Sequence, residues 1–366
     1  MAPMKYIDEF RDPALARMLL ARIAARVSRP VRLMEFCGGH THAILRHGLR
    51  SLLPEAVELR SGPGCPVCVT ANVDLDRAIA LAQVPRLILT TFGDMIRVPG
   101  SRQSLQEAKA GGADVRIVYS TLDALQIARD NPTRPVVFLG VGFETTAPTV
   151  AAAILQAQRD GLGNFSVLSL HKLTPPATRA ILDAGEVALQ GIIGPGHVTT
   201  IVGSDAWEFL PSQYGVPVAI AGFEPVDILR AVADLVDMSE TGQPAVANSY
   251  SRSVTRQGNR TALEVMGRVF EIGAADWRGL GPVPASGLHI RPEFAAMDAA
   301  CLFKVEPGPT REHPGCLCGG VLRGTVAPPE CPLFGRACTP AHPVGPCMVS
   351  GEGACAAHYQ YARDVT

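Results

Sequence analysis

Cys37 and His40 have the residue types and the spacing for a metal site or an acid–base pair. They stand in the sequence FCGGHTH at 36–42, after an apolar run at 31–36 and before a helix-like stretch at 41–48. The positive end of a helix dipole favours the thiolate of a cysteine, and a neighbouring imidazole can bind metal or transfer a proton. We expect Cys37 and His40 to share one metal ion. A buried cysteine beside a capping histidine is the structural alternative.

Cys65 and Cys68 form a second reactive pair, in the sequence GPGCPVC at 62–68. A Cys-x-x-Cys pair at the start of a helix is typical of dithiol redox motifs, in which the first thiol is acidified and the second resolves a mixed disulfide. The chain has no second Cys-x-x-Cys that would complete a four-cysteine zinc site. The pattern therefore favours redox chemistry over a zinc half-site.

The C-terminal segment carries further cysteines in loops rich in proline and glycine. Six, eight and seven residues separate Cys331, Cys338, Cys347 and Cys355. This wide spacing argues against a zinc ribbon, whereas four thiolates converging from irregular loops suit an iron–sulfur cluster. Cys316 and Cys318 remain as a neighbouring thiol pair or as alternative ligands. Cys301 stands in a helix-like stretch and is expected in the core.

Three polar loops follow apolar runs and bring further candidate side chains. Asp94 stands in TFGDMIRVPGS at 91–101, Glu144 in GVGFETT at 140–146 and His197 in GPGHVTT at 194–200. The structural alternatives are an ion pair between Asp94 and Arg97 that orders its loop, and a helix cap by Thr199. GVGFETT lacks the Gly-Lys-Ser/Thr of a phosphate loop, so it gives little support to nucleotide binding.

The elements that must position these residues alternate along the chain between about 31 and 228. Short apolar runs of continuous rather than alternating hydrophobicity indicate strands covered on both faces, as in a parallel sheet. They are VRLMEF, PRLILTTFG, DVRIVYS, PVVFLGVGF, FSVLSL, QGIIGPG and PVAIAGF. Helix-like crossovers stand at 71–83, 121–130 and 145–161. The fold class is therefore α/β, with the reactive loops at the carboxyl ends of the strands.

The strands could form one doubly wound sheet or two smaller ones, and a break in the sequence favours two. RDNPTRP at 129–135 holds two prolines and mixed charge, so it separates a first parallel-sheet α/β domain, 1–132, from a second, 133–250. After 250 a polar stretch precedes a helix-like segment at 261–272, and proline and glycine are dense from 279 to 346. We expect 251–366 to be a small irregular iron–sulfur domain held together by metal.

Composition excludes several classes of protein. Hydrophobic residues make up 47% of the chain and charged residues 18%, which is enough apolar surface for a globular core. The 33 basic and 34 acidic residues give a net charge of −1, so we expect neither nucleic acid nor a membrane as a partner. No apolar run reaches the roughly 18 residues that span a bilayer. Charges within 1–12 do not fit a secretory signal, which favours a cytoplasmic, reducing location.

The motifs FCGGHTHA, GPGCPVC, TFGDMIRVPGS, GVGFETTAPT and PGHVTTIVG and a cysteine-rich tail occur in this order. From about residue 31 to the C-terminus this set resembles the HypD family of hydrogenase maturation proteins. The resemblance implies a redox scaffold, rather than a simple turnover enzyme, on which the Fe(CN)2CO moiety of NiFe-hydrogenases is assembled. It also implies two partners, the small protein HypC and the cyanide donor HypE.

The resemblance further implies roles for the residues of the first motifs. The iron under assembly would be held by Cys37, with His40 close by, and by a cysteine from HypC. A soft thiolate at a glycine-lined, dipole-positive strand end suits a low-spin ferrous centre that bears anionic cyanides. Glu144 is a further catalytic candidate. Glu144, Asp94 and His197 would dock a partner, donate hydrogen bonds to cyanide nitrogens or order their loops.

The same resemblance implies a resident 4Fe-4S cluster that passes electrons through cysteine pairs to the iron site. The ligand set we favour is Cys331, Cys338, Cys347 and Cys355. This choice leaves Cys316 and Cys318 as a reducible pair, and Cys65 and Cys68 as the pair nearest in sequence to Cys37. The sequence leaves other selections of four tail cysteines open.

Two other functions fit part of the pattern. A stand-alone iron–sulfur thiol-disulfide reductase would use Cys65, Cys68 and the tail, but it gives Cys37 and His40 no task. A purely structural iron–sulfur scaffold would transfer no electrons. Substitution of Cys37 separates these hypotheses, because iron assembly alone requires that residue.

Overall fold

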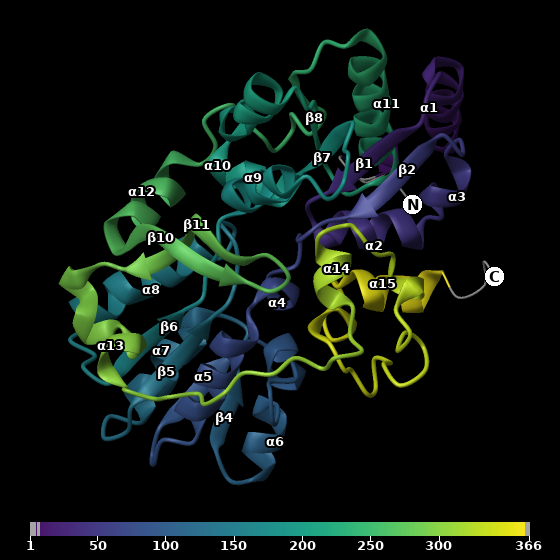
Figure 1. The fold of residues 1–366 in the computed structure, drawn as a ribbon. Coiled ribbons are helices and arrows are strands. Elements are labelled where there is room, and N and C mark those ends of the chain that lie inside the picture. The colour runs from purple at the N-terminus through teal and green to yellow at the C-terminus, as the bar shows by residue number, and fades with distance from the viewer. Residues whose placement is uncertain (1–4, 6–7, 363–366) are drawn as a thin grey trace.

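The computed structural model describes residue 5 and residues 8–362, in which helices pack against two parallel sheets (Figure 1). The first sheet has the strand order β2 (Val57–Ser61), β1 (Val31–Glu35), β7 (Gly191–Pro195), β8 (Val218–Ala221) and β9 (Val246–Asn248). The second has the order β4 (Asp114–Ile117), β3 (Ile88–Thr91), β5 (Val136–Gly140) and β6 (Phe165–Ser169). All neighbouring strands in both sheets are parallel, which confirms the α/β prediction.

The strands form where the sequence has continuous apolar runs. Every residue of β5 and β7 is buried, because helices and the other sheet cover both faces of these strands. The helices of this part are α1 (Pro13–Arg26), α2 (Gly38–Arg46), α3 (Leu49–Leu52), α4 (Pro66–Val69), α5 (Asn72–Ala82), α6 (Leu105–Ala110), α7 (Thr121–Asp130), α8 (Ala147–Arg159), α9 (Thr174–Ala184), α10 (Gly196–Val202) and α11 (Pro225–Thr241). The predicted crossovers correspond to α5, α7 and α8. Capping boxes at Ser104 and Ser120 begin α6 and α7.

The two sheets are interleaved along the chain. β1 and β2 share a sheet with β7 and β8, and the residues between them supply β3 to β6. The expected boundary at 132/133 falls inside the second sheet, where β3 pairs with β4 on one side and with β5 on the other. Strand pairing therefore does not follow the division into 1–132 and 133–250. The reason is that the chain returns to the first sheet through α9 and β7, and a local break in composition does not reveal such a long-range pairing.

The C-terminal part has more regular structure than the sequence suggested. After α12 (Arg260–Val269), the predicted helix, β10 (Phe270–Trp277) and β11 (Gly281–Ile290) form an antiparallel hairpin. Its turn requires positive φ at Gly279 and Gly281. The remaining helices are α13 (Ala299–Leu302), α14 (Cys318–Leu322) and α15 (Ala354–Tyr361), joined by loops and short turns. Much of the cysteine-rich tail is thus irregular, as predicted.

One large cluster of buried side chains joins both sheets and the tail. It contains Met34 and Ile192 of the first sheet, Leu139 of the second, and Cys347 and Met348 of the tail. Two further clusters lie between α1, α11 and the first sheet and between α7, α8, α12 and the second. The tail therefore lies at the junction of the two sheets, where α15 contacts α2 (Figure 1).

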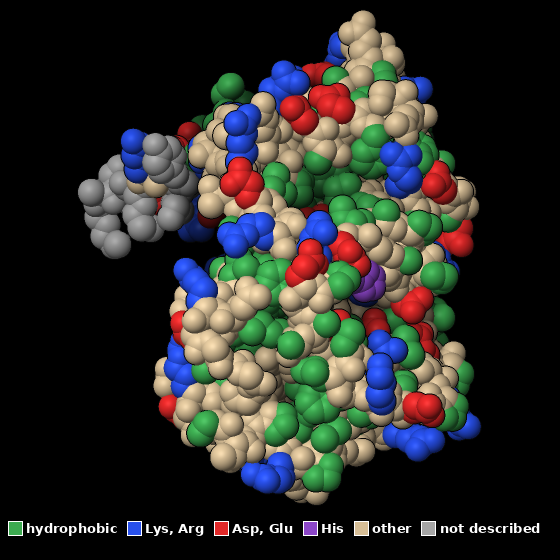
Figure 2. Space-filling view, turned by 90° about the vertical axis from the view of Figure 1, so that its left-hand side faces the viewer, with side chains coloured by type: hydrophobic (Ala, Val, Ile, Leu, Met, Phe, Trp, Pro, Cys, Tyr) green, Lys and Arg blue, Asp and Glu red, His purple; other side chains and the backbone are tan. Residues whose placement is uncertain are grey.

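The surface shows no gathering of one charge on the face drawn in Figure 2. Basic and acidic side chains are interspersed there, in keeping with the net charge of −1. Among the helices of the described residues, none has the length and hydropathy needed to cross a membrane. Residues 1–4 and 6–7, on which part of the expectation about export rests, lie outside the described residues.

Candidate functional site

The order of the strands creates a crevice in each sheet. β2 and β7 lie on opposite sides of β1, and β4 and β5 lie on opposite sides of β3. Ligands of open α/β sheets bind at such reversals of strand order, beyond the carboxyl ends of the strands. Cys37 follows β1 and His197 follows β7, whereas Asp94 follows β3 and Glu144 follows β5. The candidate residues therefore flank the two crevices.

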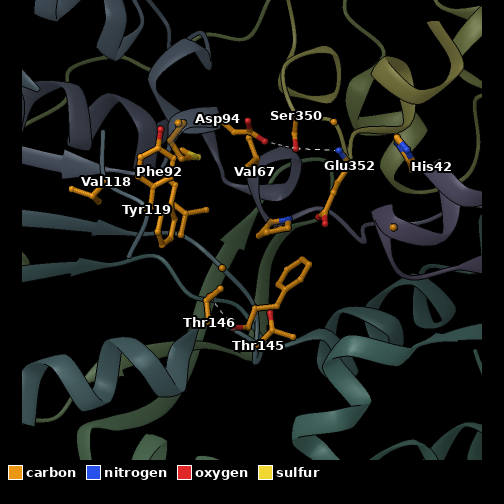
Figure 3. A pocket seen from close by; sticks show the side chains of 18 residues that line it. His42, Val67, Phe92, Asp94, Val118, Tyr119, Thr145, Thr146, Ser350 and Glu352 are labelled. Carbon is orange, nitrogen blue, oxygen red and sulfur yellow. Dashed lines mark hydrogen bonds between the residues drawn. The ribbon is translucent and has the colours of Figure 1, made fainter. Parts of the chain in front are cut away.

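A cleft of about 760 Å³ lies at these strand ends (Figure 3). Its lining comes from α2 (Gly39, His42), α4 (Pro66, Val67), the loop after β3 (Phe92–Met95), the loop after β4 (Val118, Tyr119), the loop after β5 (Val141–Phe143, Thr145, Thr146) and the tail (Ser350–Glu352). Four of the motifs thus share one cleft. In Figure 3, Asp94, Ser350 and Glu352 lie along one side, and Thr145 and Thr146 lie opposite them.

Cys37 is the residue before α2 and is 8% exposed. Burial raises the pKa of its thiol to about 12, and the charges of Glu352 and Glu35 act in the same direction. The backbone N–H groups of Gly39 and His40 oppose this shift but are outweighed. The expected thiolate is therefore wrong for this form of the protein, because desolvation exceeds the effect of the helix N-terminus. A metal ion that replaces the proton would restore the thiolate.

His40 is fully buried, and its ring is held by two backbone carbonyls. Its Nε2 lies 3.1 Å from the carbonyl oxygen of Ala221 and 3.0 Å from that of Gly222, so Nε2 carries the proton. Nδ1 has no partner among the described residues and keeps a free lone pair. Burial lowers the pKa of His40 to about 4, which keeps the ring neutral. Phe223 stacks on His40 at 4.7 Å and on His197 at 3.9 Å between ring centroids.

Glu35 is a buried carboxyl group that the sequence analysis missed. Thr41 Oγ1 and Ser61 Oγ donate to its Oε1 at 2.6 and 2.8 Å, whereas Oε2 has no partner within the described part of the chain. Burial raises the pKa of Glu35 to about 8 in spite of these hydrogen bonds, so the group is protonated at neutral pH. An acidic residue inside an apolar strand, two positions before Cys37, was the available signal.

Cys65 and Cys68 form a disulfide. Cys65 caps α4, and its Sγ accepts the backbone N–H of Cys68 at 3.3 Å, so the pair stands at a helix N-terminus as predicted. The preceding loop packs on the Cys37 backbone. Gly38 N–H donates to the carbonyl of Gly64 at 3.0 Å, and a Cβ built on Gly64 would lie 2.5 Å from the Cys37 Cα. The disulfide therefore directly follows a loop that is in contact with Cys37.

A second thiol pair lies behind this disulfide. The Sγ atoms of Cys318 and Cys347 are 2.9 Å apart, and both residues are buried. Cys68 Sγ lies 4.0 Å from the carbonyl oxygen of Pro346, the neighbour of Cys347. Cys316 instead faces Gly345, on which a built Cβ would lie 2.6 Å from the Cys316 Sγ. The partner that the structure gives Cys318 is thus Cys347.

The tail cysteines line one cavity of about 10 Å³: Cys316, Cys318, Cys331, Cys338, Cys347 and Cys355. Thiolates are the donors that iron–sulfur clusters require, so the residue types fit such a cluster. Within residues 5 and 8–362, no three His, Cys, Asp or Glu side chains are arranged to hold a single metal ion. Cys301 is exposed on the short α13, so its expected place in the core was wrong.

Asp94 and Arg97 attach the tail to the second sheet, and no ion pair between them is found in the described residues. Ser350 Oγ donates to Asp94 Oδ2 at 2.8 Å. Arg97 donates to the carbonyl oxygens of Pro340 and Val349 at 3.1 and 3.2 Å. These contacts hold the tail residues that line the cleft.

Glu144 is buried beneath the start of α9. Its Oε1 accepts the backbone N–H of Thr174, the first residue of α9, at 2.7 Å, and the Thr174 hydroxyl at 3.2 Å. Burial raises the pKa of Glu144 to about 7. Its neighbours Thr145 and Thr146 face the cleft, whereas the Glu144 carboxyl group holds α9. These contacts indicate that Glu144 orders its loop.

Sequence reasoning also missed the part of the tail that lines the cleft. Ser350, Gly351 and Glu352 face it, and a Cβ built on Gly38 would lie 2.6 Å from the Glu352 Cβ. His42 lines the cleft, and its Nε2 lies 3.2 Å from the Tyr361 hydroxyl. The position of His42 in the FCGGHTH motif was a usable signal. No local pattern marked Glu352.

Comparison with known proteins identifies the family of the chain. The family model described as "HypD: Hydrogenase formation hypA family" matches residues 14–362. The chain is 53% identical to the hydrogenase maturation factor HypD of Azotobacter vinelandii, over 98% of this chain and 97% of that protein. It is 49% identical to HypD of Rhizobium leguminosarum bv. viciae (98% and 96%) and 44% identical to HypD of Escherichia coli K12 (98% and 99%). The chain therefore belongs to the HypD family of hydrogenase maturation factors.

Proposed function

We propose that this chain is a cytoplasmic scaffold on which the Fe(CN)2CO moiety of NiFe-hydrogenases is assembled, together with HypC and HypE. The observation that carries the proposal is the contact between the Cys37 backbone and the loop of the Cys65–Cys68 disulfide at one cleft. A soft thiolate can hold iron, and a dithiol beside it can deliver two electrons. The iron is cargo that is bound, completed and released.

Cys37 and His40 have complementary tasks in this proposal. The Cys37 thiol gives up its proton and binds the iron through Sγ. Nδ1 of His40 is the nitrogen available to the iron or to its ligands, because two carbonyls hold Nε2. Burial of both residues keeps the assembling iron out of water.

Cys65 and Cys68 supply the electrons for delivery of cyanide. A thiocyanate takes up two electrons, its S–C bond breaks, and a thiolate and a cyanide ion result. The dithiol form of Cys65 and Cys68 loses two electrons and two protons and becomes the disulfide seen in the structure. HypE is the proposed thiocyanate donor.

The resident 4Fe-4S cluster is assigned here to Cys316, Cys331, Cys338 and Cys355. This set replaces Cys347 of the sequence-based choice by Cys316, because the Cys347 Sγ lies 2.9 Å from the Cys318 Sγ and so forms a pair with it. When bound, the cluster would supply single electrons. Cys318 and Cys347 line the same cavity, and the carbonyl oxygen of Pro346, the neighbour of Cys347, lies 4.0 Å from the Cys68 Sγ.

The cleft is the proposed docking place of HypC. Its walls are largely apolar, with Val67, Phe92, Val141 and Phe143 among them. Tyr119, which lines the cleft, is 93% exposed. Large exposed aromatic side chains beside a cleft are typical anchors of protein interfaces.

Infrared spectroscopy with iron and sulfide analysis tests the proposal, on the protein purified anaerobically together with HypC. The wild type is expected to show cyanide and carbonyl stretches, and Cys37→Ala is expected to lose them while about four cluster irons remain in both. Absence of the bands from the wild type, despite a bound partner and a full cluster, would contradict the proposal.

The stand-alone thiol-disulfide reductase is the second candidate. The Cys65–Cys68 disulfide is the observation in its favour. However, Cys65 is 3% exposed and Cys68 is fully buried, whereas attack on a protein disulfide requires an accessible thiolate. Retention of hydrogenase maturation by Cys37→Ala would favour this candidate.

A further inference from the structure

The tail segment 345–353 (the strap) connects a thiol pair to the loop that carries Cys37. Near its start, the Sγ of Cys347 lies 2.9 Å from the Sγ of Cys318. Near its end, Glu352 lies over Gly38, where a built Cβ would collide with the Glu352 carbonyl oxygen. One short stretch of backbone therefore touches both a redox pair and the residue next to Cys37.

The end of the strap covers Cys37. Cys37 is 8% exposed. Two neighbours line the 760 Å³ cleft: Gly39, on which a built Cβ would lie 3.7 Å from the Cys37 Sγ, and Glu352, which lies against Gly38. An iron atom or a reagent that enters from the cleft has to displace one of these two segments before it reaches the Cys37 Sγ. Gly39 belongs to α2, whose backbone is fixed by helical hydrogen bonds, so the strap is the segment that can move.

Few polar contacts hold the strap in place. Ser350 Oγ donates to Asp94 Oδ2 at 2.8 Å, and the N–H of Glu352 donates to Ser350 Oγ at 3.3 Å (Figure 3). Arg97 donates to the carbonyl oxygen of Val349 at 3.2 Å. Gly351 is exposed, and a Cβ built on it would have open space around it. Residues 345–350 are buried, so the exposed end of the strap, Gly351 and Glu352, is the part that has room to lift once these bonds open.

The thiol pair fixes the base of the strap. Gly353 packs on Cys347, with a built Cβ at 2.7 Å from the Cys347 carbonyl carbon. A bond between the Cys318 and Cys347 sulfurs would attach this base covalently to α14. Two free thiols leave it attached only by packing and by the hydrogen bonds of Arg97 and Ser350.

We infer that the strap is a lid over Cys37 and that the redox state of Cys318 and Cys347 controls its opening. Oxidation joins the two sulfurs, releases two protons, passes two electrons to a disulfide oxidant and holds the lid closed. Reduction by a dithiol breaks the bond and lets Cys37 be reached. This inference rests on the proposed function of Cys37 as the iron ligand. Its test requires no iron loading.

Alkylation of Cys37 by iodoacetamide measures the opening, on full-length, cluster-containing protein under anaerobic conditions, with peptide mass spectrometry as the readout. Ser350→Ala removes the bond to Asp94 and is expected to raise the rate at Cys37 about five- to tenfold, the effect of one lost hydrogen bond. Ser212→Ala is the matched control, because Ser212 is exposed and bonds only to the carbonyl of Glu208 in its own turn. Equal rates in Ser350→Ala and the wild type would overturn the lid.

The redox experiment compares protein equilibrated with oxidised or with reduced dithiothreitol, which is removed by desalting before iodoacetamide is added because its thiols would consume the reagent. In the wild type, Cys37 is expected to be alkylated more slowly after oxidation than after reduction. In the Cys318→Ser variant, Cys37 is expected to be alkylated at the rate of the reduced wild type under both conditions. Cys347→Ser serves the same purpose if Cys318→Ser fails to retain its iron. If either variant keeps the wild-type ratio of the two Cys37 alkylation rates, the redox control is overturned. The response would then come from another pair, because Cys65 and Cys68 remain intact in both variants.

The alkylation and infrared experiments can refute the lid and the iron assembly independently of each other. Infrared bands that depend on Cys37, together with alkylation rates unaffected by Ser350→Ala, would refute the lid and leave iron assembly in place. Alkylation rates that respond as expected, together with an absence of cyanide and carbonyl bands, would refute Cys37 as the iron ligand. Cys37 would then be a thiol whose accessibility depends on redox state.

Discussion

The backbone of Gly64 lies against the backbone of Cys37, and a Cβ built on Gly64 would come within 2.5 Å of the Cys37 Cα. No side chain fits between the two loops. The contact fixes the spacing between the candidate iron ligand and the disulfide that begins at the next residue, Cys65. The two loops can approach this closely only because residue 64 is a glycine, which has no Cβ.

Gly64→Ala is expected to separate these loops. The added methyl group meets backbone atoms, which cannot rotate away, so unfolding should become easier by about 1–3 kcal/mol. The Fe(CN)2CO infrared bands should weaken strongly, with the tail cluster iron unchanged. Gly267→Ala is the control: this glycine lies inside α12, a Cβ on it would have nothing within 4 Å, and alanine should stabilise the helix. Similar behaviour of the two variants would contradict the close-approach argument.

Iron content distinguishes the two ligand sets of the tail. Cys316→Ser should lose most of the cluster iron, whereas Cys347→Ser should retain about four irons per chain. The reason is that the Cys347 sulfur is paired with Cys318 at 2.9 Å. Cys301→Ser is the control, because Cys301 is exposed on α13. Iron loss in Cys347→Ser with retention in Cys316→Ser would restore the set read from the sequence.

Glu144 should make the stability of the protein depend on pH. Burial raises its pKa from 4.5 to about 7 in the folded state, so between these values the folded protein holds a proton that the unfolded chain has released. Stability should therefore fall as pH rises from 4.5 to 7 and change no further above that. Glu144→Gln should remove about 3 kcal/mol of this pH dependence.

Thermal unfolding at a series of pH values measures the contribution of Glu144. Glu264→Gln, at an exposed position of α12, provides the matched control and is measured over the same pH series. A Glu144→Gln curve parallel to the wild type would show that Glu144 is ionised in the folded protein, contrary to the burial argument.

Lys172 joins the hairpin to the second sheet and to α5. Its Nζ donates to the Asp276 carbonyl oxygen at 2.6 Å and lies 3.7 Å from Asp74 Oδ2, and the residue is 2% exposed. Lys172→Met leaves the Asp74 carboxylate without its buried cation, so the loss of stability should be about 3 kcal/mol. Adding Asp74→Asn should recover part of it, because the unpaired charge is then gone. Additive effects in thermal unfolding would show that the two residues do not interact.

Local sequence was sufficient for the strands between about 31 and 228 and for the position of the site along them, although it did not reveal the hairpin of β10 and β11. The apolar runs become β1 and β3 to β8, and apart from the edge strand β4 these strands are buried on both faces, an environment that requires continuous hydrophobicity. The reactive motifs follow these runs, and parallel strands place their carboxyl ends on one edge. The cleft lined by α2, α4 and the loops after β3 and β5 follows from these two facts.

Tertiary structure decided which strands share a sheet, how the cysteines pair and how exposed the groups are. β1 pairs with β7 across a long separation, and Cys318 lies beside Cys347 rather than Cys316, because these contacts depend on how the whole chain packs. The sequence predicted that a helix begins shortly after Cys37. The Cys37 thiol is nonetheless protonated, because burial in the surrounding fold, together with the charge of Glu352, exceeds the effect of the helix N-terminus. The sequence determined which groups could react, and packing determined which of them meet and in which protonation state.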